Sequence, residues 1–79
     1  MDNKIGTRVR ELRISQNLTM LELSKLIDVS YSFMGLIERN QRTPGIKNIA
    51  KLCGILNVSY DYLIIGKETN FIVDNRDAL

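Results

Sequence analysis

The sequence predicts an all-α fold: a compact domain of five helices within residues 1–66, followed by a tail over residues 67–79. Apolar residues recur three and four positions apart through most of the chain, as they do on one face of an α-helix. Residues that cap or end helices separate these segments. Hydrophobic residues make up 44% of the chain and charged residues 25%, which is typical of a soluble globular protein. A chain of 79 residues can bury one modest core, so we expect a single domain.

The first helix is expected over residues 4–16, with Asp2 or Asn3 as its N-terminal cap. Asn17 suits the left-handed conformation that ends many helices, because its short polar side chain tolerates a positive φ. The inner face of this helix is predicted to consist of three apolar residues: Ile5, Val9 and Leu12.

Residues 19–40 are predicted to form two short helices joined by a tight turn, which is the pattern of a helix-turn-helix. Thr19 and Glu22 have the spacing of a capping box, in which each side chain accepts from the other residue's backbone N–H. The second helix is therefore expected over residues 20–27, and Ser30 can cap the third helix. The inner faces are expected to hold Leu23, Ile27, Met34 and Ile37, while Ser32, Gly35, Leu36 and Arg39 share the opposite face of the third helix.

A loop at residues 41–45 leads into a fourth helix over residues 46–56, which Asn57 ends. Ser59 is expected to cap a short fifth helix, and Gly66 to end it. The inner face of the fourth helix is predicted to hold Ile46, Ile49, Ala50, Cys53 and Leu56, and the fifth helix is predicted to close the core with Tyr62, Leu63 and Ile65.

Two parts of the chain leave alternatives open. The tail over residues 67–79 contains a short β-prone run at residues 71–73 between polar residues. It is a strand in a dimer, a segment packed back on the domain, or a disordered tail. Leu26 lies off the inner face of the second helix, so it is either partly exposed or covered by another segment.

The net charge of +2 hides an asymmetry along the chain. Residues 1–51 carry nine Lys and Arg against five Asp and Glu, a balance of +4, whereas residues 52–79 carry two against four, a balance of −2. A basic N-terminal part with an acidic tail fits a nucleic-acid surface on one side of the domain.

Several classes of chemistry are not expected. The chain has no His and a single Cys, Cys53, so neither a zinc site nor an internal disulfide is predicted. There is no general base of the His type and no glycine-rich phosphate loop, so we expect no enzyme and no cofactor. The sequence shows no membrane span, no apolar signal segment and no evident small-molecule site, so we expect a cytoplasmic protein.

Three segments together carry a family resemblance: LTMLELSKLIDVS at residues 18–30, IER at residues 37–39 and NVSYDYL at residues 57–63. On these, the chain resembles the helix-turn-helix family of phage repressors and Cro (XRE-like) from about Ile5 to Gly66. The run YSFMGLIERN at residues 31–40 is most similar to short restriction–modification controller proteins. The resemblance implies a repressor-type DNA-binding domain that regulates transcription as a repressor on a near-palindromic operator.

This chain departs from that family at three positions. Asp28 and Asn40 stand where Gly is common because the chain takes a positive φ, which Asp and Asn tolerate better than most residues. Met20 stands where the family often has a Gln that contacts a phosphate. That phosphate contact is therefore in question here.

A DNA-binding role would use the outer face of the third helix to read bases and flanking donors to bind phosphates. Phe33 could instead lie at the edge of the core. The positions that match Arg13 and Glu38 form an ion pair in similar proteins, and this pair would hold the third helix in place. The predicted base-reading residues are Tyr31, Ser32, Phe33 and Leu36, and the predicted phosphate-contacting residues are Arg8, Arg10, Met20, Arg39, Gln41 and Arg42.

The expected partners are double-stranded DNA and a second copy of this chain, which would form a homodimer. A rival interpretation is an antitoxin or another protein-interaction module that uses the same helical domain. The dimer interface is predicted in the fifth helix and the tail, on their spare apolar residues: Tyr60, Ile64, Phe71, Ile72 and Val73.

Overall fold

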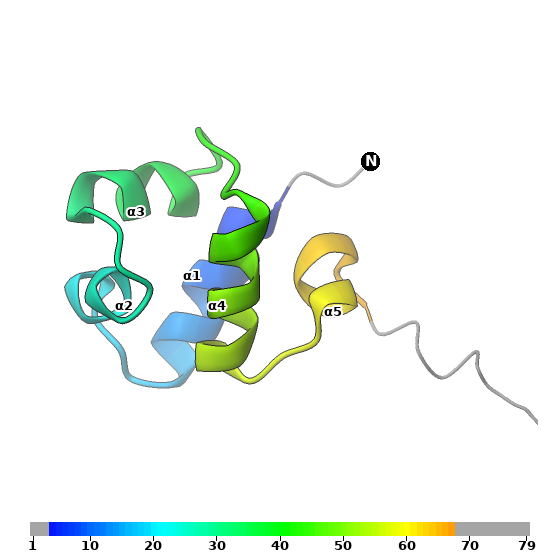
Figure 1. The fold of residues 1–79 in the computed structure, drawn as a ribbon. Coiled ribbons are helices and arrows are strands. Elements are labelled where there is room, and N and C mark those ends of the chain that lie inside the picture. Colours follow the sequence, from blue (N-terminus) through cyan, green and yellow to red (C-terminus); the bar gives the residue numbers. More distant parts are fainter. Residues whose placement is uncertain (1–3, 68–79) are drawn as a thin grey trace, which may run out of the picture.

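The computed structural model describes residues 4–67, which form five helices and no strand (Figure 1). The predicted all-α fold is therefore confirmed. The first, second and fourth helices match their predicted bounds to within one residue at each end. The third begins directly after its predicted cap, and the fifth lies between its predicted cap and end. The helices are α1 (Ile5–Ser15), α2 (Met20–Leu26), α3 (Tyr31–Glu38), α4 (Ile46–Leu56) and α5 (Tyr60–Ile65).

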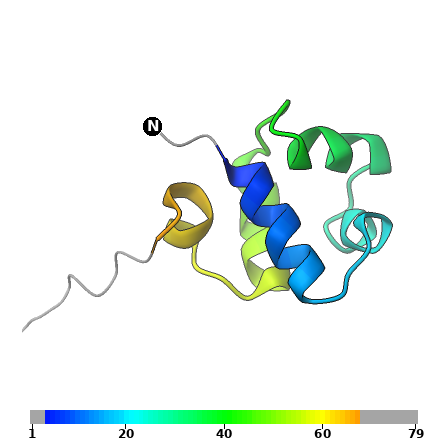
Figure 2. The ribbon, with the colours of Figure 1, turned by 180° about the vertical axis from the view of Figure 1, so that it is seen from behind.

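Helix α1 is the element against which most of the domain packs. It contacts α3, α4 and α5, while α2 packs mainly on α3. Figure 1 shows α2 and α3 to one side of α1 and α4, with α5 on the other side, and Figure 2 shows the same order from behind, with α1 nearest the viewer. The α2–α3 pair is thus held at one end of the molecule, away from α5.

The helix ends form largely as their local sequences predict. The capping box of Thr19 and Glu22 is present at the start of α2. Ser30 caps α3 and Ser59 caps α5 through their side-chain oxygens. Within residues 4–67, positive φ angles of 58° to 61° occur at four non-glycine residues, all of them at helix ends or in the turns that follow: Asn17, Asp28, Asn40 and Asn57.

The core joins all five helices, and it contains the predicted inner residues of α1, α2 and α3. In α4 the prediction is confirmed at Ile49, Cys53 and Leu56, which are buried or pack against the core, and it is wrong at two other positions. Ile46 is 70% exposed and Ala50 is exposed, whereas Leu52, which the prediction omitted, is completely buried. The apolar residues of α4 fit two overlapping helical stripes, and packing against α1 and α5 selects one of them. The buried core residues are Val9, Leu23, Ile27, Met34, Ile37, Ile49, Leu52, Leu56 and Leu63, and Ile5 and Leu12 of α1 are half-buried against them.

The apolar residues of α5 also differ from the prediction. Leu63 is completely buried as expected, but Ile65 is 46% exposed rather than part of the core. Ile64, which was expected at a dimer interface, instead packs against the core. The observed orientation of this six-residue helix about its axis differs from the predicted one by one residue, so Ile64 and Ile65 exchange their expected environments. The tail beyond residue 67, including residues 71–73, lies outside the described residues.

Long polar side chains bind the carbonyl groups at several helix ends. Gln16 Nε2 donates to the carbonyl oxygen of Leu56 at 2.7 Å, at the end of α4. Lys51 Nζ donates to the carbonyl oxygen of Ile27 at 3.3 Å, at the end of α2. Such contacts satisfy carbonyl groups that have no partner within their own helix, and they tie neighbouring helices together. Within residues 4–67, no helix has both the length and the apolar composition needed to cross a bilayer.

Candidate nucleic-acid interface

The α2–turn–α3 unit is built by local hydrogen bonds at both helix starts. In the capping box, Glu22 N donates to Thr19 Oγ1 at 3.0 Å and Thr19 N donates to Glu22 Oε1 at 2.8 Å. Phe33 N donates to Ser30 Oγ at 3.0 Å and so caps α3. Asp28 takes a positive φ of 60° in the turn between the two helices. These bonds determine where each helix begins, and therefore the direction in which α3 leaves the turn.

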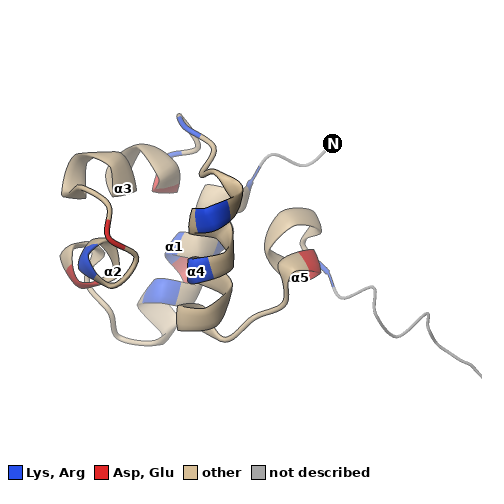
Figure 3. Cartoon of the chain, viewed as in Figure 1, with Lys and Arg blue, Asp and Glu red and all other residues tan. Residues whose placement is uncertain are grey.

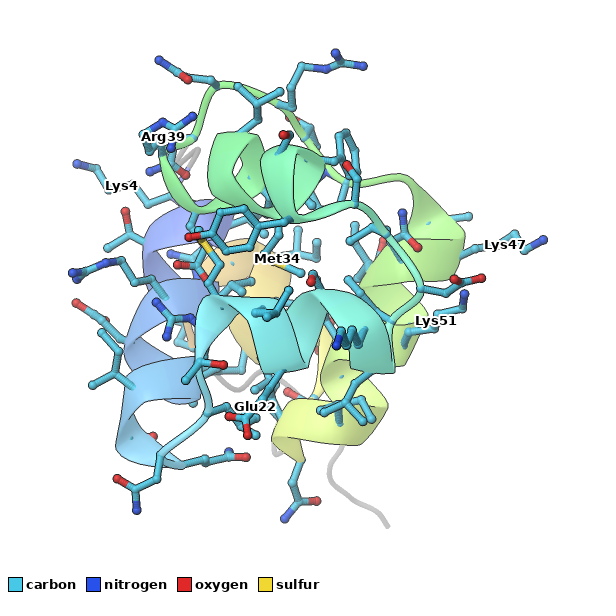
Figure 4. The ribbon with its side chains drawn as sticks, turned by 90° about the vertical axis from the view of Figure 1, so that its left-hand side faces the viewer. Lys4, Glu22, Met34, Arg39, Lys47 and Lys51 are labelled. Carbon is cyan, nitrogen blue, oxygen red and sulfur yellow. The ribbon has the colours of Figure 1, made fainter. Side chains whose placement is uncertain are left out.

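Helix α3 has one buried face and one exposed face. Met34 and Ile37 are completely buried. Figure 4 shows Met34 between the ribbons of α2 and α3. On the outer face Tyr31 is 54% exposed and Ser32 is also exposed, while Leu36 is half-buried. The residues predicted to read bases therefore lie on, or at the edge of, the accessible side of the helix.

The predicted ion pair between Arg13 and Glu38 forms, and it joins α1 to the last turn of α3. Arg13 Nε donates to Glu38 Oε2 at 2.6 Å and Nη2 donates to Oε1 at 3.0 Å, which makes the contact bidentate. The two side chains are 12% and 4% exposed. The hydrogen bond to Glu38 raises the pKa of Arg13 above its usual value, so the guanidinium stays charged.

A second junction between α1 and α3, which the sequence did not reveal, involves Gly6 and Asn40. Asn40 Oδ1 accepts from Gly6 N at 2.9 Å, and Asn40 Nδ2 donates to Thr7 Oγ1 at 2.8 Å. A side-chain Cβ at Gly6 would lie 1.9 Å from the carbonyl oxygen of Ile37. The first turn of α1 can approach the end of α3 this closely only because residue 6 has no side chain. The amide oxygen of Asn40 therefore caps α1 by accepting from a backbone N–H in its first turn. The side chain of Lys4, the N-cap residue of α1, makes no capping hydrogen bond.

Arg8 does not belong to the phosphate-contacting set in which it was predicted. Its side chain is buried in the domain, with Nε donating to the carbonyl oxygen of Leu63 at 2.8 Å and Nη2 to that of Ile64 at 2.9 Å. The guanidinium thus stabilises the C-terminal end of α5. The sequence could not distinguish this role from a phosphate contact, because both need a charged donor on α1.

The remaining predicted phosphate-contacting donors are exposed. Arg10 lies on α1, while Arg39, Gln41 and Arg42 follow one another closely at the end of α3 and in the next loop. Arg39 Nε donates to Gln41 Oε1 at 3.3 Å. The guanidinium carbon of Arg42 lies 5.6 Å from the centre of the Phe33 ring, within the range of a cation–π contact. Phe33 is half-buried, and its ring supports the guanidinium of Arg42.

Further cations surround the α2–α3 end of the molecule. Figure 4 shows Lys4 and Arg39 on one side of this face, with Lys47 and Lys51 of α4 on the other. Figure 3 shows that acidic residues are also present here, on α2, in the turn and at the end of α3. Lys47 was not among the residues predicted for this interface, although it is exposed and lies in the first turn of α4.

A hollow of about 360 Å³ lies on the outer side of α3, next to the N-terminus of α2. Met20, predicted to contact a phosphate, is half-buried and lines this hollow. Its thioether is at best a weak acceptor and offers a phosphate no donor, so its contribution here is apolar surface. The hollow is lined by Met20, Tyr31, Ser32, Gly35, Leu36 and Arg39.

Among residues 4–67, no group of three or more His, Cys, Asp or Glu is arranged to hold a metal ion. Cys53 is half-buried, and burial raises the pKa of its thiol. A thiol with a raised pKa is a poor nucleophile at neutral pH because little of it is ionised.

Comparison with known proteins finds similarity to helix-turn-helix proteins. The model of the helix-turn-helix family matches residues 9–63. The chain is 33% identical over 69 residues to the transcriptional regulator SinR of Bacillus subtilis strain 168, an alignment that covers 85% of this chain and 62% of SinR. It spans between 44% and 64% of the length of SinR and three other curated relatives.

Two solved structures share the arrangement of the helices. The restriction–modification controller protein C.AhdI from Aeromonas hydrophila is 36% identical with a TM-score of 0.71, covering 77% of this chain and 92% of that one. The P22 c2 repressor, crystallised with a synthetic operator, is 30% identical with a TM-score of 0.76, covering 80% of this chain and 96% of that one.

Proposed function

This chain belongs to the helix-turn-helix family, and we propose from that premise that it is a DNA-binding transcriptional repressor whose helix α3 enters the major groove. The observation that carries the proposal is the two-sided environment of α3. Its inner face is completely buried at Met34 and Ile37, while its outer face is accessible. A recognition helix needs both conditions, because it must be held rigidly and must also reach base edges.

The base-reading residues in this proposal are Tyr31, Ser32 and Leu36, with Phe33 at the edge of the set. The hydroxyl of Ser32 can donate to or accept from either kind of base pair, and Leu36 can contact the methyl group of thymine. The hydroxyl of Tyr31 can reach a base edge or a phosphate. Direct hydrogen-bond readout by these three side chains would be sparse, so apolar contacts would carry much of the discrimination.

The phosphate-contacting residues in this proposal are Arg10, Arg39, Gln41 and Arg42. The cation–π contact with Phe33 orients Arg42, which reduces the conformational freedom that it would lose on binding. Lys47 extends the set to α4. Contacts of this kind position α3 on the duplex and make binding sensitive to salt, but they do not read sequence directly.

We further propose that two copies bind one near-palindromic operator, with their α3 helices about 34 Å apart, one turn of DNA. A single domain of this size reads only a few base pairs. Helix α5 lies on the side of the molecule away from α3 (Figure 1). Exposed apolar side chains of α4 and α5 offer an interface: Ile55, Tyr60 and Ile65. Sedimentation analysis should show a dimer, and a strict monomer at high concentration with and without operator DNA would contradict this part of the proposal.

The test of DNA binding is the dependence of affinity on salt, measured by fluorescence anisotropy on duplexes of selected and random sequence. Four cations per protomer (Arg10, Arg39, Arg42 and Lys47) would give a dimer a log–log slope of about −7. Arg42→Ala should weaken binding to all sequences and reduce the slope by about two units. Lys67→Ala removes the same charge beyond α5 and serves as the matched control, with no change in slope expected. A slope near zero for the parent protein would contradict the proposal and favour the protein-interaction interpretation.

A further inference from the structure

The hollow beside α3 has a composition that suits an apolar group. Its walls include the thioether chain of Met20, the ring of Tyr31 and the branched side chain of Leu36, and apolar atoms make up most of the lining. The polar groups are the hydroxyls of Ser32 and Tyr31 and the guanidinium of Arg39. None of the six lining residues carries the side-chain amide that pairs with adenine or the carboxylate that accepts from cytosine.

Arg39 closes the hollow at one end. A Cβ built on Gly35 would lie 3.1 Å from Nη1 of Arg39, so the guanidinium lies back against the helix where Gly35 leaves room. Its Nε donates to Gln41 Oε1 at 3.3 Å, which restrains it from the other side. The positive charge at this end favours the approach of DNA, while the rest of the hollow stays apolar.

We propose that this hollow receives the 5-methyl group of a pyrimidine base in the major groove, which makes Met20 and Leu36 specificity-determining residues. The inference rests on the proposed function, and it deepens that function by naming the chemical group that is read. The methyl group is the main apolar feature of the major groove, and thymine and 5-methylcytosine both carry it. Met20 contributes from α2, so the reading surface in this proposal extends beyond the recognition helix.

The experiment uses the full chain and a duplex selected from a random pool by binding. Each thymine in turn is replaced by uracil, which removes only the methyl group and keeps the hydrogen-bonding edge. We expect at least one thymine per half-site at which the replacement weakens binding about fourfold, the effect of burying one methyl-sized group. Replacing that thymine–adenine pair by 5-methylcytosine–guanine and by cytosine–guanine then separates the methyl group from the rest of the base pair. The methylated duplex should bind about fourfold more tightly than the unmethylated one.

Two variants connect the effect to the hollow. In Leu36→Ala and Met20→Ala the ratio of thymine to uracil affinity should fall from about four toward one. Leu26→Ala is the matched control, because Leu26 is a 52% exposed apolar residue of α2 outside the hollow. Its ratio should equal that of the parent protein. Because the ratio is measured within each variant, a general loss of affinity does not change it.

The outcomes separate the two proposals. Salt-sensitive DNA binding with no thymine sensitive to uracil would overturn the methyl-reading inference and leave the proposed function intact. A sensitive thymine whose ratio is unchanged in both variants would also overturn the inference, since the methyl group would then be read elsewhere. Absence of salt-sensitive binding to every duplex would overturn the proposed function and the inference with it.

Discussion

The inner face of α3 buries Met34 and Ile37 completely, whereas the outer face of the same eight-residue helix leaves Tyr31 and Ser32 exposed. The inner face also lies beside the two junctions with α1, namely the Arg13–Glu38 ion pair and the contact between Gly6 and Asn40. The outer face packs less against the rest of the domain and borders the hollow. The difference shows that one short helix separates two tasks. Its inner residues hold the helix in place, and we expect substitutions of its exposed outer residues to have little effect on stability.

Removing buried volume from the inner face should have the largest effect on stability. Met34→Ala should lower the free energy of unfolding by about 2–5 kcal/mol, because the deletion leaves a cavity among completely buried neighbours. Chemical denaturation with urea measures this change. A loss below about 1 kcal/mol would mean that the inner face is not close-packed around this side chain.

The ion pair between α1 and α3 should give the next largest effect. Glu38→Ala leaves the guanidinium of Arg13 largely buried without its carboxylate, at a cost of about 3 kcal/mol in unfolding free energy. The double replacement of Arg13 and Glu38 by Ala should cost less than the sum of the two single replacements. A double-mutant cycle from denaturation curves checks this, and strict additivity would show that the two charges are not coupled.

The close approach of α1 to the end of α3 predicts a smaller loss of stability when a single methyl group is added at Gly6. Gly6→Ala places a Cβ against the backbone carbonyl of Ile37, so α1 must shift away from α3 at a cost of about 1–3 kcal/mol. Gly54→Ala is the matched control in α4, because a Cβ there meets nothing within 4 Å. It should stabilise the protein by about 0.5–1 kcal/mol through helix propensity. Equal effects of the two substitutions in thermal denaturation would argue against a tight junction at Gly6.

The outer face should show the smallest effects on stability and the clearest effects on binding. Leu36→Ala and Ser32→Ala should each change the free energy of unfolding by less than about 1 kcal/mol. Their operator discrimination should fall by about 1–3 kcal/mol for each interaction with a base that the substitution removes. Tyr31→Phe keeps the ring and tests the hydroxyl alone. Stability and operator affinity measured on the same variants decide whether the outer face of α3 reads DNA. If Leu36→Ala and Ser32→Ala bind operator and random DNA as the parent does, α3 is not the reading element.

The candidate site could be predicted from the sequence only in part. The periodicity of residues 31–39 was enough to separate the inner face of α3 from its outer face, because a helix repeats every 3.6 residues whatever surrounds it. Helical periodicity could not predict the roles of Arg8 and Met20. A buried arginine that binds α5 and an exposed one that could bind a phosphate look alike in a sequence. The hollow beside Met20 exists only because the start of α2 lies next to the outer side of α3.

The local features of this protein follow from short stretches of its amino-acid sequence. The capping box at Thr19, the caps at Ser30 and Ser59 and the positive φ at Asn17 depend on bonds and steric limits within a few consecutive residues. Tertiary packing selects the buried stripe of α4, because the apolar residues of this helix permit two stripes and the neighbouring helices cover one of them. It also decided that Gly6 meets Asn40, since that contact joins residues 34 positions apart, and no local rule relates them.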